Sequence, residues 1–142
     1  MKKIISISAL ILIMVSVFSI SANCQKAKAI KTSVSKSSKV EVYYFHFTRR
    51  CVTCQAVETE SKAAISALYP TQAKKGLIIF KAVNLDEKTS AALSKKCKAE
   101  GQALLVISGG KRLDLTEQGF MYAKSNPEKL KAELKKAIDT LL

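Results

Sequence analysis

The chain has 142 residues and carries 24 Lys and Arg against 11 Asp and Glu, a formal net charge of +13. This length accommodates one domain of ordinary size beside a leader and excludes separate catalytic and regulatory domains. Four cysteines, unevenly spaced, exclude a small scaffold held together by disulfides. Abundant aliphatic and aromatic residues after position 40 exclude a disordered chain, and a single long apolar run excludes a polytopic membrane protein.

The first 22 residues have the pattern of an export signal. Lys2 and Lys3 precede a run from Ile4 to Ile20 that is apolar apart from serines, and small residues follow. An uncleaved membrane anchor needs about 20 apolar residues, so this shorter, serine-interrupted run fits that alternative less well. We therefore expect residues 1–22 to be a signal peptide and the protein to be exported, with the periplasm as its compartment.

Two cleavage routes fit the end of this leader. Signal peptidase would cut after Ala22, whereas a lipoprotein peptidase would cut before Cys24 and leave a lipid on that cysteine. The residues around Cys24 match a lipoprotein motif only in part, and both routes stay open. Residues 23–39 are rich in Lys and Ser without a sustained apolar period, so we predict a linker, which lipidation would turn into a membrane tether.

The excess of basic residues raises the question of a charged partner. The lysines are dispersed along the chain, without an aromatic and basic patch or the signature of a nucleic-acid-binding fold. An exported protein also seldom meets nucleic acid, so we expect no nucleic-acid partner. Solvated helix faces and a solvated linker account for most of the charge, and an anionic membrane surface or an acidic protein is the better candidate partner.

Regular structure is predicted from residue 40 onward. Residues 40–47 and 77–85 are β-branched and aromatic, as in strands buried on both faces. Between them, residues 51–68 show an apolar stripe with the helical period, followed by a polar connection. Asp86 is predicted to cap a further helix that runs to about Lys98. The spacing of strand, helix and strand predicts a right-handed βαβ unit with parallel strands.

The C-terminal part predicts a hairpin followed by a helix. Two strands, 103–108 and 111–115, are joined by a Gly-Gly turn, and residues 119–122 are expected in a polar loop. Asn126 is a good N-cap for a last helix, with proline at its first position. That helix has an amphipathic stripe made of Leu130, Leu134, Ala137, Ile138 and Leu141.

The residues with recognisable chemistry lie between the first strand and the first helix. Cys51 and Cys54 form a C-x-x-C motif, which places the first cysteine at a helix N-terminus. Unpaired backbone N–H groups and the positive end of the helix dipole stabilise a thiolate there. Arg49 and Arg50 add positive charge that acts in the same direction. Cys51 is therefore the predicted nucleophile, and Cys54 is placed to resolve a mixed disulfide.

The order of elements, β-α-β-α-β-β-α, and the place of the C-x-x-C resemble the thioredoxin superfamily over residues 39–142. More narrowly, the run from Tyr43 to Cys54 is similar to the nitrophenyl-compound nitroreductase subunit ArsF family of exported bacterial thioredoxin-like proteins, which is associated with arsenic-resistance genes. The resemblance implies an α/β thioredoxin-like fold with a mixed central sheet flanked by helices. It also implies an electron-transfer subunit or thiol-transfer protein that works with a partner protein.

Two positions depart from ordinary thioredoxins. Those proteins carry an aromatic residue before the first cysteine and a cis-proline that faces the pair, where this chain has Arg50 and Ala103. In the superfamily the proline loop helps to dock substrate and to keep metals off the dithiol. Its absence weakens the prediction of general substrate reduction and strengthens a rival, the binding of a metal or of arsenite.

In that rival, Cys97 joins Cys51 and Cys54 as a third soft ligand for arsenite or another thiophilic ion. A closed zinc site would need a fourth ligand, and His46 is the only histidine. Cys97 is otherwise expected to be a small buried residue, and His46 an ordinary strand residue. A non-catalytic binding module is a third alternative.

We therefore predict an exported thiol-disulfide oxidoreductase or redox relay subunit that acts on a partner protein. Its redox group would be the Cys51–Cys54 disulfide, with no metal or other cofactor. A nitroreductase activity would need a flavin or a partner enzyme, because the sequence shows no site for a flavin.

Overall fold

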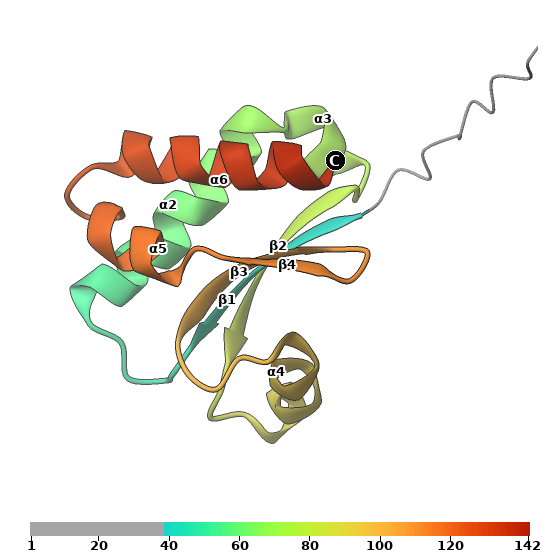
Figure 1. Cartoon of the computed structure of the whole chain (residues 1–142). Helices are drawn as coiled ribbons and strands as arrows, with labels where there is room; N and C mark the ends of the chain where they lie inside the picture. Colours follow the sequence, from blue (N-terminus) through green and yellow to red (C-terminus); the bar gives the residue numbers. More distant parts are fainter. Residues whose placement is uncertain (1–38) are drawn as a thin grey trace, which may run out of the picture. The chain divides into compact units, whose positions relative to one another are not determined.

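The computed structural model describes residues 39–142, which fold as a mixed α/β domain around one sheet (Figure 1). The predicted signal peptide, Cys24 and the linker up to residue 38 lie outside the described residues. Within the described part, none of the helices combines the length and the apolar character that crossing a membrane requires. The four strands are β1 (Val40–His46), β2 (Ile78–Asn84), β3 (Ala103–Ser108) and β4 (Lys111–Asp114).

The sheet has the order β2-β1-β3-β4. Strand β1 pairs in parallel with β2 and antiparallel with β3, and β4 returns antiparallel beside β3. The predicted parallel pairing of the first two strands and the predicted hairpin are both confirmed. Because β1 and β3 occupy the centre, they are buried along almost their whole length, whereas the short edge strand β4 is largely exposed.

Helices cover both faces of this sheet. Figure 1 shows α2, α5 and α6 on one side and α4 on the other. A 3₁₀ turn, η1 (Lys88–Ser90), leads into α4. The helices are α2 (Val52–Leu68), α3 (Pro70–Lys74), α4 (Ala91–Cys97), α5 (Thr116–Tyr122) and α6 (Pro127–Leu141).

The core is divided by the sheet into two clusters. Side chains alternate along a strand, so Val42 and Tyr44 of β1 face α2 and α6, while Tyr43 and Phe45 face α4. The cluster under α2, α5 and α6 is the larger, and the cluster under α4 includes Cys97. Cysteines that lie on opposite faces of the sheet therefore cannot contact each other.

The last helix forms as predicted. The Asn126 side chain accepts a hydrogen bond from the Lys129 backbone N–H at 3.2 Å, and Pro127 takes the first helical position. The buried stripe consists of the expected residues Leu130, Leu134, Ala137, Ile138 and Leu141.

The predicted cap at Asp86 is wrong. Helix α4 begins at Ala91 with Ser90 as its N-cap residue, after the 3₁₀ turn, and ends at Cys97. Asp86 instead accepts a hydrogen bond from the Thr48 backbone N–H at 2.7 Å. It therefore ties the end of β2 to the loop that follows β1.

The predicted polar loop over residues 119–122 is also wrong, because α5 occupies it. Gly119 is buried where α5 approaches the sheet and α2. A Cβ atom at this position would lie 3.1 Å from a methyl carbon of Leu104 and 3.4 Å from one of Val57. Glycine lowers helix propensity, but here it permits close packing of α5, which sequence pattern alone does not reveal.

Leu134 provides a test of how α6 packs. Its side chain is completely buried, so Leu134→Ala should lower the free energy of unfolding by about 2–5 kcal/mol, through lost apolar burial and the cavity left behind. Urea denaturation followed by circular dichroism measures this change. Lys136→Ala on the exposed side of the same helix is the control and should change stability by less than about 0.5 kcal/mol. Equal losses in the two variants would contradict this packing.

Candidate functional site

The two cysteines of the C-x-x-C lie where β1 passes into α2. An exposed loop leaves the sheet at Phe47, and Cys51 then serves as the N-cap residue of α2 in an extended conformation. The Cys51 sulfur accepts a hydrogen bond from the Cys54 backbone N–H at 3.3 Å. The sequence-based placement of Cys51 at a helix N-terminus is therefore confirmed, and its sulfur takes the part that a serine or aspartate oxygen plays in other caps.

The two sulfur atoms are 2.8 Å apart, with both cysteines in the thiol form. Cys51 is exposed, whereas Cys54 is 4% exposed and faces the sheet. A disulfide needs its sulfurs to close to about 2.05 Å, which is a small movement from here. One sulfur is thus accessible to a partner and the other is sheltered directly behind it.

The environment shifts the pKa values of the two thiols in opposite directions. Hydrogen bonds from the Cys54 thiol and then from the Cys54 backbone N–H lower the pKa of Cys51. Burial, followed by the hydrogen bond to Cys51, raises the pKa of Cys54. The first proton therefore leaves from Cys51, and Cys54 keeps its proton to donate to the resulting thiolate.

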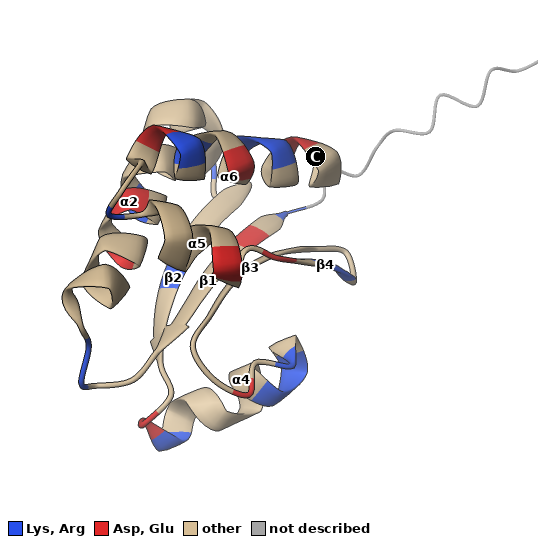
Figure 2. Cartoon of the chain, turned by 60° about the vertical axis from the view of Figure 1, so that its left-hand side comes forward, with Lys and Arg blue, Asp and Glu red and all other residues tan. Residues whose placement is uncertain are grey.

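The two arginines before the motif differ in their surroundings. Arg49 is exposed, and Arg50, just before α2, forms an ion pair with Glu58 of that helix, eight residues further along the chain. Figure 2 shows this positive charge in the loop that leads into α2. The hydrogen bonds of Cys54, rather than the charge of either arginine, are the main cause of the lowered Cys51 pKa.

Ala103 is buried at the start of β3, opposite Phe45 of β1. The preceding residue, Gln102, is the one that reaches the dithiol, because its Oε1 lies 3.4 Å from the Cys54 sulfur and accepts a hydrogen bond from it. No cis peptide bond occurs among residues 39–142. Gln102 was not predicted from the sequence, although its place just before the third strand was a usable signal.

Tyr44 of β1 faces α2, on the side of the sheet where Cys54 is buried. The sequence analysis predicted only a core residue here, and Tyr44 is indeed completely buried. Its hydroxyl has no hydrogen-bond partner among the described residues, and burial, followed by the charge of Cys54, raises the pKa of Tyr44. A strand residue next to the C-x-x-C is therefore a polar part of the site.

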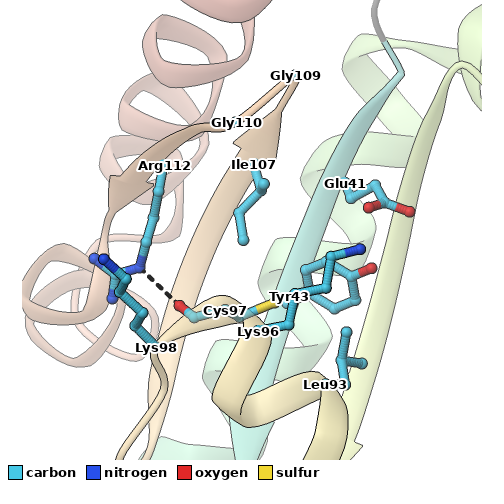
Figure 3. A pocket seen from close by; sticks show the side chains of 10 residues that line it. All are labelled: Glu41, Tyr43, Leu93, Lys96, Cys97, Lys98, Ile107, Gly109, Gly110 and Arg112. Atoms are coloured by element: carbon cyan, nitrogen blue, oxygen red, sulfur yellow. Dashed lines mark hydrogen bonds between the residues drawn. The ribbon is translucent and has the colours of Figure 1, made fainter.

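Cys97 lies on the other face of the sheet. It ends α4, packs in the cluster of Tyr43 and Phe45, and is 5% exposed. It lines a pocket of about 340 Å³, and the Arg112 Nε donates a hydrogen bond to the Cys97 carbonyl at 3.0 Å. Figure 3 shows this pocket between α4 and the β3–β4 hairpin. Burial raises the pKa of the Cys97 thiol, which disfavours the thiolate.

The three thiols therefore do not converge. Cys51 and Cys54 belong to the face covered by α2, and Cys97 belongs to the face covered by α4. Among the described residues, no group of three or more His, Cys, Asp and Glu side chains is placed to hold a metal ion. His46 is a buried strand residue whose ring Nδ1 lies 3.0 Å from the Phe47 carbonyl oxygen.

Comparison with known proteins gives no direct guide to the role of this site: no protein-family model matches the chain, and no curated protein does.

The opposed pKa shifts predict a pH-dependent order of alkylation. With iodoacetamide, which reacts with thiolates, Cys51 should react at a pH below the range of an ordinary thiol, and Cys54 should react only above that range. Peptide mass spectrometry of the reduced protein after timed exposure at each pH separates the cysteines. Labelling of Cys54 before Cys51 as the pH rises would contradict the hydrogen-bonding scheme.

Proposed function

We propose that this protein is a thiol-disulfide exchange protein of the thioredoxin-like class, in which Cys51 attacks and Cys54 resolves. The observation that carries the proposal is the pairing of an exposed thiol of lowered pKa with a buried thiol 2.8 Å behind it, at the N-terminus of one helix. A thiolate that is both stabilised and accessible is the reactive form of a redox cysteine.

The reaction balances as a two-electron transfer. The Cys51 thiolate attacks one sulfur of a partner disulfide, a mixed disulfide forms, and the partner's other sulfur leaves as a thiolate that takes a proton from solvent. Cys54 then loses its proton and attacks the Cys51 sulfur. The Cys51–Cys54 disulfide forms, the partner leaves as a dithiol, and the partner has gained the two electrons that this protein has lost. The reverse sequence oxidises a partner dithiol.

The thioredoxin-like class is supported by the position of the motif within the fold. The C-x-x-C joins a central strand to the helix that follows it, in a mixed sheet with helices on both faces. The resemblance of the Tyr43-to-Cys54 run to the nitroreductase subunit ArsF family supports a protein as the proposed partner. Export to the periplasm, also proposed from the leader, would place the dithiol where disulfides form and persist.

The stabilised Cys51 thiolate also suggests a direction for electron flow. Any interaction that favours the reduced form makes the disulfide easier to reduce, and hence a stronger oxidant. The lowered pKa of Cys51 acts in that sense. We therefore propose a disulfide more oxidising than that of a dithiol without these hydrogen bonds.

The alternatives draw less support from the site. Capture of arsenite by three thiols needs Cys97 beside Cys51 and Cys54, but Cys97 lies across the sheet. A non-catalytic binding module would not need an exposed thiol whose pKa is lowered. The capture alternative predicts that loss of Cys97 weakens metal binding and leaves exchange unchanged, and the binding-module alternative predicts that Cys51 can be replaced without a phenotype.

Two substitutions test the proposed roles. Cys51→Ser should abolish disulfide exchange, since no thiolate remains at the exposed position, and Cys54→Ser should trap the mixed disulfide because the resolving thiol is gone. Exchange is measured with a model disulfide substrate, and the trapped adduct with non-reducing gels and mass spectrometry.

Cys97→Ser is the matched control, because it removes a buried thiol from the opposite face and should leave exchange unchanged. Full exchange by Cys51→Ser would exclude the proposed function.

A further inference from the structure

The hydroxyl of Tyr44 is an unexplained polar group in the core. Tyr44 lies at the middle of β1, between β2 and β3, and is 0% exposed. Within the described residues its hydroxyl makes no hydrogen bond of ordinary geometry. A buried hydroxyl without a partner is costly, and a redox or catalytic role is one of the explanations for such a group.

Tyr44 and Val57 pack in the same cluster under α2, and Cys54 is the buried residue of α2 one turn before Val57. The Cys54 thiol therefore lies on the face of the sheet that Tyr44 occupies. Burial raises the pKa of Tyr44, and the charge of a Cys54 thiolate raises it further. Tyr44 therefore stays protonated and can donate but cannot act as a base. In return, its hydroxyl lowers the pKa of Cys54, against the larger effect of burial.

Other titratable groups near Cys54 and Tyr44 have partners of their own. Cys51 shares the helix end with Cys54. Arg50, whose charge slightly lowers the pKa of Tyr44, is paired with Glu58. The His46 ring lies 5.7 Å from the Tyr44 ring, and its Nδ1 is next to a backbone carbonyl.

Gln102 and Tyr44 therefore approach Cys54 with opposite polarity. The Gln102 oxygen accepts the proton of the thiol form. The Tyr44 hydroxyl is a donor, and its hydrogen bond to Cys54 is strong only when Cys54 is a thiolate, because a sulfur anion is a far better acceptor than a neutral thiol. Each group thus favours a different protonation state of the same sulfur.

We propose that Tyr44 is a positioning residue that donates a hydrogen bond to the Cys54 thiolate formed transiently during exchange. The inference rests on the proposed function for its role in turnover, but the hydrogen bond itself can be tested without it. When an external thiolate attacks Cys51 of the disulfide, the Cys51–Cys54 bond breaks and Cys54 leaves as a thiolate in an apolar surrounding. The Tyr44 hydroxyl stabilises this leaving group until a proton from solvent neutralises it. In the opposite direction, it stabilises the thiolate that Cys54 must form before attacking the mixed disulfide.

The test compares Tyr44→Phe with Tyr43→Phe in the full chain carrying Cys51→Ala. Tyr43 is the matched control because it is the neighbouring buried tyrosine of β1, but it faces the opposite side of the sheet. The rate at which iodoacetamide labels Cys54 is followed by peptide mass spectrometry as the pH rises. At a fixed pH below the plateau, Tyr44→Phe should reduce this rate about tenfold, the effect of losing one hydrogen bond to a charged group.

The plateau at high pH controls for access to Cys54, because there all of the thiol is ionised. A plateau that Tyr44→Phe leaves unchanged, together with a lower rate below it, supports the inference. Equal rates for the parent, Tyr43→Phe and Tyr44→Phe over the whole pH range would overturn it. So would equal losses in the two tyrosine variants, which would indicate a general effect of packing.

A second readout uses the protein with both cysteines of the motif. Tyr44→Phe should slow cleavage of the Cys51–Cys54 disulfide by glutathione and also its re-formation, while the equilibrium between the two forms stays the same. This follows because the hydrogen bond acts on a thiolate that neither end state contains. A shifted equilibrium with unchanged rates would also overturn the inference. If the labelling effect is found but Cys51→Ser still exchanges disulfides, the proposed function fails and the hydrogen bond stands.

Discussion

The chemistry of this protein depends on one local arrangement, in which the sulfur of Cys51 caps helix α2. An N-cap side chain must accept hydrogen bonds from the first turn of its helix, and a thiolate accepts them better than a thiol. Folding of α2 therefore stabilises the anion at Cys51. The same first turn brings the Cys54 thiol to 2.8 Å, where it donates the hydrogen bond that contributes most to the lowered pKa. The formation of α2 therefore also lowers the pKa of the Cys51 thiol.

The sheet gives the two kinds of cysteine different surroundings. On the α2 face, the dithiol lies at the end of β1 with one sulfur exposed and with Tyr44 and Gln102 beside the other. On the α4 face, Cys97 is buried, its thiol pKa is raised, and its backbone carbonyl is held by Arg112. Side chains alternate along β1, so the two faces stay separate. Burial disfavours the thiolate form of Cys97, and its thiol is therefore unreactive.

The sequence predicted most of the strands and the long helices because their signals are local. Apolar runs define β1, β2 and β3, and the cap at Asn126 with the stripe after it defines α6. The C-x-x-C could be placed at a helix start because only the preceding strand and the following period were needed. The α/β architecture with a mixed sheet follows from the same patterns.

What the sequence did not predict depends on contacts between distant residues. Asp86 has the character of a helix cap, but its carboxylate is occupied by the Thr48 backbone N–H, 38 residues away along the chain. Helix α5 forms around Gly119, because packing against Leu104 outweighs a low helix propensity. The face of the sheet that α4 covers likewise becomes known only once the strands are paired.

The most direct test of the central claim is the equilibrium of the reduced chain with mixtures of reduced and oxidised glutathione, with and without arsenite. The dithiol account predicts one reversible two-electron transition that requires Cys51 and Cys54, and an arsenite effect, if any, that does not require Cys97. A protein that shows no reversible transition, yet binds arsenite tightly through all three thiols, would contradict the account.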